Sequence, residues 1–346
     1  MKLKLTRMRK KAGRLKRRLL QWFEKSLARK APGLLLELFP PTAVIIEPTN
    51  ICNLRCPLCP TSESRRKKGR MPLDALRKIV AELPPSIRTC QLYLSGEPLL
   101  HDDCFAMVSE LSRLGLKTSL STNGTRLGKC VDEVLDSQPD ELIIALDGAK
   151  RETYERYRIG ADFDSVVDNV RRLILAKRAR NLLRPRIVLQ CLVTRDTEAE
   201  LGAVQELARD LGVDEISFIS VSLGTHHTDA TTRRELAERF LPQDASYCRY
   251  ERSLNGDYVL KWKQPYCPLW RLPVILWNGD LTACCFDLNG IEVYGNVLER
   301  SFHDVWRGAN HISTVQRMLP RNMTLCKTCG ITSGDENRHF QIVEKK

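Results

Sequence analysis

The sequence predicts an α/β fold with a parallel sheet, preceded by a basic helical arm and followed by a small cysteine-rich unit. Short β-rich runs begin after Pro40 and Pro41 and alternate with longer helical runs as far as about Leu223. Strands separated in this way by helices are typical of a parallel sheet with right-handed crossovers. A second unit, rich in cysteine, runs from about Cys267 to Cys329.

The expected strands and helices follow one another along the chain. We expect strands at Val44–Glu47, Gln91–Leu94, Thr118–Ser121, Leu142–Leu146, Ile187–Val193 and Glu215–Ile219. We expect helices, from apolar residues at helical spacing, at Leu73–Leu83, Cys104–Leu114, Lys129–Ser137, Phe163–Ala179 and Glu198–Leu211. The loops after the strands carry the unusual residues, and in parallel α/β folds that end of the sheet is where chemistry is built.

The rest of the chain has a different pattern. Residues 224–265 are mixed and polar, with a helical stretch around Arg233–Phe240. In the cysteine-rich unit, the turn signal Asn278-Gly279-Asp280 stands between two apolar runs and predicts a hairpin. We therefore expect an arm at 1–41, a core at 42–223, and a linker with a small α+β unit at 224–346.

Composition limits the location of the protein. The chain has 346 residues, 42% of them hydrophobic, and no apolar run approaches the roughly 20 residues that a membrane-spanning helix needs. The basic N-terminus is not followed by the apolar region of a secretory signal. Thirteen cysteines without such a signal favour a reducing cytosol, with metal ligation rather than disulfides.

The positive charge is concentrated in the arm. Residues 1–30 hold 13 Lys and Arg and one acid, Glu24, which is +12 of the chain's net +13. Within the arm an apolar face recurs at helical spacing, interleaved with basic residues: Leu15, Leu19, Trp22, Phe23 and Leu27. A basic amphipathic helix suits the surface of an anionic membrane. The alternative is that the helix packs on the body and shows its charges to water; direct nucleic-acid binding ranks behind both, because no recognition module follows the arm.

Three cysteines form a pattern that is one ligand short of a closed metal site. Cys52, Cys56 and Cys59 follow the first expected strand with C-x₃-C-x₂-C spacing. Thiolates favour zinc or iron–sulfur centres, and a cubane cluster usually takes four. With three, one iron keeps open positions for a bidentate ligand, such as the amine and carboxylate of S-adenosylmethionine (SAM). The alternative is a zinc knuckle whose fourth ligand comes from elsewhere.

These residues and the loops after the next three strands resemble the radical SAM superfamily. "YLSGEPLLHDD" follows the second strand and looks like the family's glycine–glutamate–proline segment, although Ser95 stands where a first glycine is usual. "SLSTNGT" and "IIALDGAKRETYERYR" follow the third and fourth strands. The resemblance covers about residues 43–220 and implies a partial (β/α)₆ barrel with a [4Fe–4S] cluster on Cys52, Cys56 and Cys59.

The resemblance also implies cofactor contacts. Ser95, Gly96 and Glu97 would offer backbone carbonyls and a carboxylate to the ammonium of SAM. The polar candidates near the nucleoside are Ser121, Asn123, Asp147 and Arg158. For Asp147 and Arg158, a strand-end turn or a helix cap is an equally good interpretation. In this family the cluster gives one electron to the sulfonium, and the resulting 5′-deoxyadenosyl radical takes a hydrogen atom from the substrate.

The second cysteine set resembles the SPASM/twitch extension, which holds auxiliary iron–sulfur clusters. Cys267, eleven residues, Gly279, four residues and Cys284 precede the pair Cys326-x₂-Cys329. The resemblance makes Cys267, Cys284, Cys326 and Cys329 the ligands of one auxiliary [4Fe–4S] cluster, because no further cysteine follows Cys329. Cys285 can replace Cys284, although the glycine spacing favours Cys284; a structural zinc ribbon is the alternative.

One departure bears on the reaction. Sulfatase-maturing relatives carry an aspartate immediately after the cysteine equivalent to Cys284, where it can act as a base. This chain has Cys285 there, and the nearest acid is Asp287. A serine- or cysteine-oxidising maturase is therefore not expected.

Two enzyme interpretations follow. The first is hydrogen abstraction from a small-molecule, sugar-like or lipid-linked substrate, leading to dehydrogenation, epimerisation or carbon–carbon bond formation. The alternative is maturation of a ribosomal peptide or protein; the residues before Val44 are too few and too basic for a leader-binding domain of roughly 80 residues. Either implies a donor such as flavodoxin or ferredoxin and a cytoplasmic location, with the arm at the inner membrane face. A zinc-stabilised nucleic-acid-binding protein is the remote third hypothesis.

Overall fold

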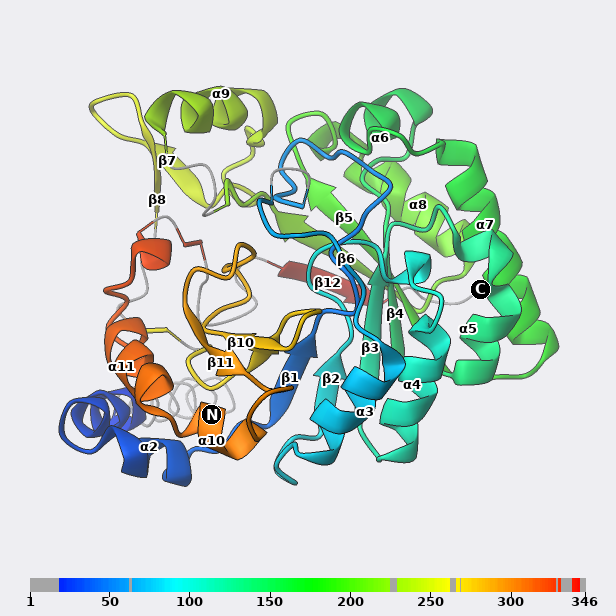
Figure 1. Ribbon diagram of the computed structural model, residues 1–346. Coiled ribbons are helices and arrows are strands. Elements are labelled where there is room, and N and C mark those ends of the chain that lie inside the picture. Colours follow the sequence, from blue (N-terminus) through cyan, green and yellow to red (C-terminus); the bar gives the residue numbers. More distant parts are fainter. Residues whose placement is uncertain are drawn as a thin grey trace, which may run out of the picture.

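The parallel sheet that the sequence predicts is the centre of the computed structural model (Figure 1). The structure describes residues 19–61, 64–224, 229–261, 266–267, 269–327, 329–330 and 338–342. Six strands pair in sequence order, each parallel to the next: β1 (Ala43–Ile46), β2 (Thr89–Gln91), β3 (Lys117–Thr122), β4 (Glu141–Ala145), β5 (Arg186–Val193) and β6 (Glu215–Ser220). The predicted α/β fold is confirmed.

One strand is displaced from its predicted place. The expected strand at Gln91–Leu94 begins at Thr89 and ends at Gln91. Beyond it the Leu92 amide donates to the carbonyl of Ser119 at 2.9 Å, and the chain then turns at Gly96, which has a φ of +78°. The apolar run therefore continues past the strand into the loop that carries Ser95 and Glu97.

Helices cover the outside of the parallel strands (Figure 1). Those predicted are α3 (Leu73–Ala81), α4 (Cys104–Arg113), α5 (Val131–Ser137), α7 (Phe163–Ala179) and α8 (Leu201–Leu211), and α6 (Arg151–Tyr157) is additional. Short 3₁₀ turns occupy Pro98–Leu100, Leu127–Lys129 and Glu198–Glu200. Asp162 starts α7 by accepting the amide of Ser165 at 2.7 Å, and Gly212 ends α8 in the left-handed conformation.

The cysteine-rich unit extends the same sheet. The predicted hairpin is confirmed: β9 (Val274–Ile275) pairs antiparallel with β10 (Asp280–Thr282), which pairs with β11 (Val293–Asn296). Because β9 lies parallel to β1, and β12 (Arg338–Ile342) lies antiparallel to β6, ten of the described strands form one sheet. The helices of this unit, α10 (Phe302–Trp306) and α11 (Ala309–Met318), gather near the N-terminal segment, followed by a 3₁₀ turn at Thr324–Cys326.

Both parts of the chain share one apolar core. Buried residues of the parallel strands, such as Ile46 and Leu120, belong to the same cluster as Trp270, Leu281 and Trp306 of the cysteine-rich unit. The boundary predicted at residues 223–224 therefore separates segments of sequence that lie on one continuous sheet and core.

The linker carries the helical stretch predicted around Arg233–Phe240. It contains α9 (Ala230–Phe240) and a small hairpin of β7 (Tyr250–Arg252) and β8 (Tyr258–Leu260). Phe240 packs edge-on against Tyr157, with ring centroids 5.8 Å apart, and shares an apolar cluster with Leu54 and Cys56. The linker therefore covers the loop that carries the first three cysteines.

The described part of the arm turns most of its apolar face to solvent. Residues 19–30 are helical, and α2 (Pro32–Leu38) follows; Leu15 lies outside the described residues. Leu27 packs against the core, whereas Leu19 and Trp22 are 60% and 69% exposed. The alternative in which the apolar face packs on the body is therefore wrong for most of its described residues. Within the described ranges, no helix combines the length and the apolar character required to cross a bilayer.

Candidate metal centres

The first three cysteines share the loop after β1. The Cys59 amide donates to the carbonyl of Cys56 at 3.0 Å, which closes the C-x₂-C turn. The sulfurs also meet N–H groups: Leu54 donates its amide to Cys52 Sγ at 3.4 Å, and Arg158 Nη1 lies 3.8 Å from Cys56 Sγ. Such donors stabilise thiolate ligands and tune a cluster's potential. The donor set therefore fits a soft, thiolate-bound group.

Burial favours the protonated thiol at two of these cysteines, Cys52 and Cys56. Desolvation raises the pKa of Cys52 and raises that of Cys56 to about 11, although Arg158 opposes the second shift. Metal ligation requires the thiolate, so binding at this loop releases protons.

Two fully buried polar residues fix the path of the cysteine loop. Thr49 Oγ1 donates to the carbonyl of Gly69 at 2.7 Å. Asn50 donates to the carbonyl of Lys67 and accepts the amide of Gly69, both at 2.9 Å. Both side chains are 0% exposed, so each bond is shielded from water. These bonds join the two ends of the segment that carries the three cysteines.

Gly96 is required by steric contact as well as by backbone conformation. Its φ of +78° favours glycine, and a Cβ there would lie 2.5 Å from the carbonyl oxygen of Thr49. The next amide, of Glu97, donates to the carbonyl of Ile51 at 2.8 Å. The structure therefore places the segment predicted to bind the SAM ammonium directly against the cysteine loop.

The Glu97 carboxylate is already engaged by the protein. Its Oε1 accepts from Thr122 Oγ1 at 2.7 Å and from the Leu99 amide at 3.1 Å, and Oε2 accepts the Asn123 amide at 2.7 Å. Burial raises the pKa of Glu97 against these hydrogen bonds. Acceptor capacity remains only at Oε2, so the carboxylate's first role is to tie the ends of β2 and β3 together.

Asn123 and Ser121 differ in whether their side chains reach the cysteine loop. Asn123 Nδ2 donates to Asn53 Oδ1 at 3.1 Å and lies 3.9 Å from Cys52 Sγ, so it reaches the cysteine loop. Ser121 is half-buried on β3, in register with Ile143 of β4. The structure brings Asn123, but not Ser121, into contact with the predicted cluster ligands.

Asp147 and Arg158 form a buried ion pair beside the same loop. Arg158 Nε donates to Asp147 Oδ2 at 2.6 Å, and the Leu192 amide donates to Oδ1 at 2.6 Å. The side chains are 1% and 18% exposed, respectively. Arg158 also ends α6 as its C-cap residue. The pair thus combines a structural role with a cation aimed at Cys56.

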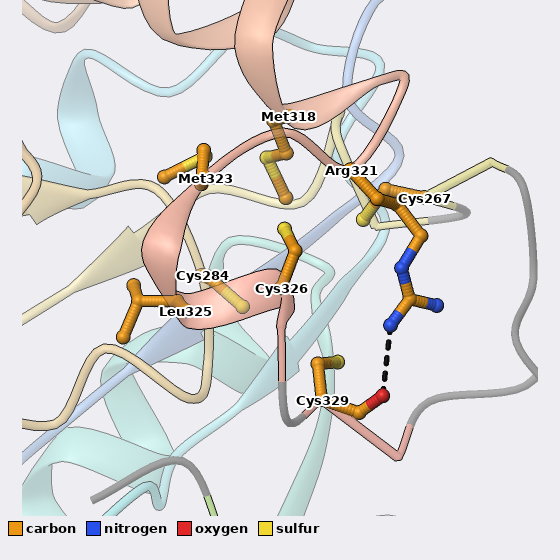
Figure 2. Close-up of a pocket in the computed structure, with 8 residues that line it drawn as sticks. All are labelled: Cys267, Cys284, Met318, Arg321, Met323, Leu325, Cys326 and Cys329. Carbon is orange, nitrogen blue, oxygen red and sulfur yellow. Dashed lines mark hydrogen bonds between the residues drawn. The ribbon is translucent and has the colours of Figure 1, made fainter. Parts of the chain in front are cut away.

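Four cysteines of the C-terminal unit line one pocket (Figure 2). Cys284 comes from the loop after β10, and Cys326 and Cys329 come from the 3₁₀ turn and the segment after it. Arg321 Nη2 donates to the carbonyl of Cys329 at 2.8 Å, which holds the end of that segment. The pocket is lined by Cys267, Cys284, Met318, Arg321, Met323, Leu325, Cys326 and Cys329.

Cys284 and Cys285 occupy different surroundings. Cys284 lines the pocket, whereas Cys285 packs against the apolar group of Ile45, Val274 and Leu276. A hydrogen bond between the two thiols lowers the pKa of Cys284 and raises that of Cys285. The choice of Cys284 over Cys285 as the ligand stays a prediction, now with different surroundings for the two thiols.

Asp287, the nearest acid, is part of the turn. Its carboxylate accepts from Thr282 Oγ1 at 2.7 Å and from the amides of Ile291 and Glu292 at 2.8 and 2.7 Å. The side chain is buried and holds the loop between β10 and β11. It has the partners of a structural cap and not the open position of a base.

The four cysteines of this pocket do not have the arrangement of ligands around a single metal ion. Among the described residues, no group of three or more His, Cys, Asp or Glu is arranged to hold a single metal ion. In a cubane each iron takes its own thiolate, so the ligands surround a group of atoms. All thirteen cysteines are thiols.

Two residues that contact the predicted SAM-binding segment were not predicted from the sequence. Glu47, at the end of β1, accepts the hydroxyl of Ser95 and pairs with Arg66, whose Nη2 also lies 3.3 Å from Ser95 Oγ. Glu47 and Arg66 are nineteen positions apart in the sequence, with no periodic relation to mark them. Ser95, which departs from the family's usual glycine, thus has a partner of its own.

Two family profiles match the chain. The radical SAM superfamily profile matches residues 46–179, and the profile of the SPASM iron–sulfur cluster-binding domain matches residues 267–330. The chain therefore belongs to the radical SAM superfamily and carries a C-terminal SPASM domain. Its radical SAM domain binds SAM and a [4Fe–4S] cluster, and its SPASM domain binds auxiliary iron–sulfur clusters.

Relatives span most of the chain. The "Tungsten-containing aldehyde ferredoxin oxidoreductase cofactor-modifying protein" of Pyrococcus furiosus is 23% identical over 317 residues, covering 83% of this chain and 86% of the relative. "Mycofactocin maturase MftC" of Mycobacterium tuberculosis is 24% identical over 308 residues, covering 84% and 76%. The structure of Streptococcus suis SuiB bound to SAM has a TM-score of 0.61 at 17% identity, covering 84% and 72%.

Proposed function

We propose that this protein is a radical SAM maturase that modifies a ribosomally made peptide or protein. The observation that carries the chemistry is that one protein has two cysteine sets. A three-cysteine loop packs against Gly96, and a four-cysteine pocket lies in the unit whose strands extend the same sheet. The substrate class is supported by the relative MftC, a maturase by name, which matches 84% of the chain. This replaces the small-molecule interpretation as the first hypothesis.

The proposed ligands of the SAM-binding cluster are Cys52, Cys56 and Cys59. The bound group would supply one electron to cleave SAM to methionine and a 5′-deoxyadenosyl radical, which abstracts a substrate hydrogen atom. The protein's task is to hold the reactants in contact and to exclude water. Thr49, Asn50 and the linker helix α9 suit this task, because they fix and cover the loop.

Other residues would bind the remainder of SAM. We assign Ser95, Gly96 and Glu97 to the ammonium, with backbone carbonyls as the main acceptors, because the Glu97 carboxylate is largely engaged. Asn123 and the Asp147–Arg158 pair approach Cys52 and Cys56, so they would lie at the cofactor's edge of the loop. Ser121, on β3 two residues before Asn123, is assigned to the nucleoside of SAM.

The auxiliary site would hold one [4Fe–4S] cluster on Cys267, Cys284, Cys326 and Cys329. Four thiolates fill one position on each iron, so this cluster offers no open site to a substrate. We therefore assign it to electron transfer. A donor such as flavodoxin or ferredoxin would supply the electron for SAM cleavage, in a reducing cytoplasm that keeps the cysteines out of disulfides.

Anaerobic reconstitution tests the chemistry. The intact chain should bind about eight irons and release 5′-deoxyadenosine from SAM on reduction. A Cys52→Ala, Cys56→Ala, Cys59→Ala triple variant should lose about half of that iron and all cleavage. Zinc in place of iron, or cleavage by the triple variant, would overturn the assignment.

Isotope transfer tests the substrate class. Short peptides encoded beside the gene, prepared with deuterated side chains, should pass deuterium into 5′-deoxyadenosine. The second candidate is a cofactor or other small molecule, favoured by the name of the Pyrococcus relative. Transfer from a small molecule, with none from any peptide, would favour that candidate over the maturase.

A further inference from the structure

One side of the N-terminal helix presents large apolar residues to solvent. Leu19, Trp22 and Phe23 are 60%, 69% and 43% exposed, and Arg29 and Lys30 beside them are also exposed. At about 100° per residue, these five positions fall within roughly a third of the helix circumference. We call them the arm face. A soluble helix usually has the reverse arrangement, with its large apolar residues packed inward.

The opposite side of this helix is fixed to the body. Glu24 and Ala28 are each 2% exposed. Glu24 accepts the hydroxyl of Tyr266, which in turn accepts Trp270 Nε1 at 2.9 Å. Rotating the helix to bury Leu19 and Trp22 would break this buried chain and expose Ala28, so the direction of the arm face is set by packing.

The charge of the arm identifies the partner. Residues 1–30 carry +12 of the chain's +13, and a second copy of the arm would therefore repel the first. An anionic lipid surface attracts cations and accepts Trp and Leu at its acyl boundary. We propose that the arm face binds the surface of a bilayer that contains anionic phospholipid. This goes beyond the proposed function and does not depend on the substrate.

Vesicle co-sedimentation of the reconstituted full chain tests the proposal. The protein should sediment with phosphatidylcholine vesicles that contain phosphatidylglycerol, and far less with phosphatidylcholine alone. Each cation removed from the surface should weaken partitioning about fivefold at low salt, so an Arg29→Gln, Lys30→Gln variant should lose more than tenfold. The fluorescence of Trp22 should shift to shorter wavelength on binding, and a Trp22→Phe variant should lose most of that shift.

Two matched triple variants distinguish binding through the arm face from non-specific binding by other exposed apolar residues. Leu19→Ser, Trp22→Ser, Phe23→Ser should abolish sedimentation while iron content and SAM cleavage persist. The control Leu183→Ser, Leu254→Ser, Ile291→Ser removes apolar residues that are 91%, 107% and 69% exposed elsewhere, and should sediment as the unmodified protein does. Equal binding to neutral vesicles, equal loss in the control, or dimerisation through the arm face instead of vesicle binding would overturn the proposal.

Discussion

Arg66 and Glu47 form a buried two-pronged ion pair within the radical SAM domain, and each also bonds to the backbone of the SPASM domain. Arg66 Nη1 and Nη2 donate to the Glu47 carboxylate at 2.8 and 2.6 Å, and the side chains are 11% and 0% exposed. Arg66 Nε donates to the carbonyl of Leu288 at 2.5 Å, and the Trp277 amide donates to Glu47 at 3.2 Å. Because Ser95 bonds to the same carboxylate, the pair aligns the hairpin with the SAM-binding segment.

Removing either partner of this ion pair should destabilise the fold, and removing both should destabilise it little more than removing one. Glu47→Gln or Arg66→Met alone leaves a buried charge without its partner, so each should destabilise the fold by about 3–5 kcal/mol. The double variant should cost less than the sum of the two. Anaerobic urea unfolding measures these differences.

A surface pair provides the control for that cycle. Arg77 and Asp74 are 2.9 Å apart but 51% and 91% exposed, so Arg77→Met should change stability by less than about 1 kcal/mol. Additive losses at Glu47 and Arg66 would show that the two side chains stabilise the protein independently.

The Asp147–Arg158 pair allows its structural and cofactor roles to be separated. Arg158→Gln should reduce both stability and SAM cleavage, because it strands the buried Asp147 carboxylate and removes the cation near Cys56. Adding Asp147→Asn should restore much of the stability but not the cleavage. Thermal unfolding and 5′-deoxyadenosine release are the two measurements.

Arg156, on the same helix, serves as the comparison. Its pair with Asp196 spans 3.2 Å at 56% and 36% exposure, so Arg156→Gln should leave cleavage unchanged. Recovery of cleavage in the Asp147→Asn, Arg158→Gln double variant would assign the pair to folding alone.

Replacing Cys284 and replacing its neighbour Cys285 should have different effects on the iron content of the protein. Cys284→Ser should remove about four irons per chain, because Cys284 lines the four-cysteine pocket. Cys285→Ser should retain them, since Cys285 packs against Ile45 and Val274 instead. Iron and sulfide counting on both variants decides the ligand, and the opposite pattern would make Cys285 the ligand.

His311 should make the protein acid-sensitive. It is 0% exposed, and burial lowers its pKa from the ordinary 6.5 to about 4. The unfolded chain therefore binds the proton more tightly, so stability is complete above about pH 6.5 and falls as the pH drops toward 4. From pH 7 to pH 5 the loss should be about 2 kcal/mol.

Comparison of two histidine variants isolates this effect. His311→Asn keeps a donor for the carbonyl of Trp306 but cannot titrate, so its melting temperature should fall less with acid than that of the unmodified protein. His303→Asn, at a side chain 70% exposed, should follow the unmodified protein. Parallel acid profiles for all three proteins would contradict the prediction.

The sequence predicts this fold well where the signal is local. Apolar periodicity gave the same bounds for α7, Phe163–Ala179, as the structure, and cysteine spacing placed both sets of candidate ligands. The outward turn of Trp22 was beyond reach, because it depends on Glu24 meeting Tyr266 across 242 residues. The partnership of Glu47, Arg66 and Trp277 is likewise fixed by tertiary packing, which no spacing rule encodes.

The β1–β9 ladder has a mechanical consequence. Ile45 and Ile46 pair with Val274 and Ile275, so backbone hydrogen bonds link the strand that leads into the three-cysteine loop to the hairpin that leads to Cys284. Two lobes joined by a linker can swing about a hinge, whereas strands of one ladder cannot separate without breaking it. If the two cysteine sets hold the proposed clusters, this ladder would keep the distance between them nearly fixed, and substrate would have to enter without the two lobes swinging apart.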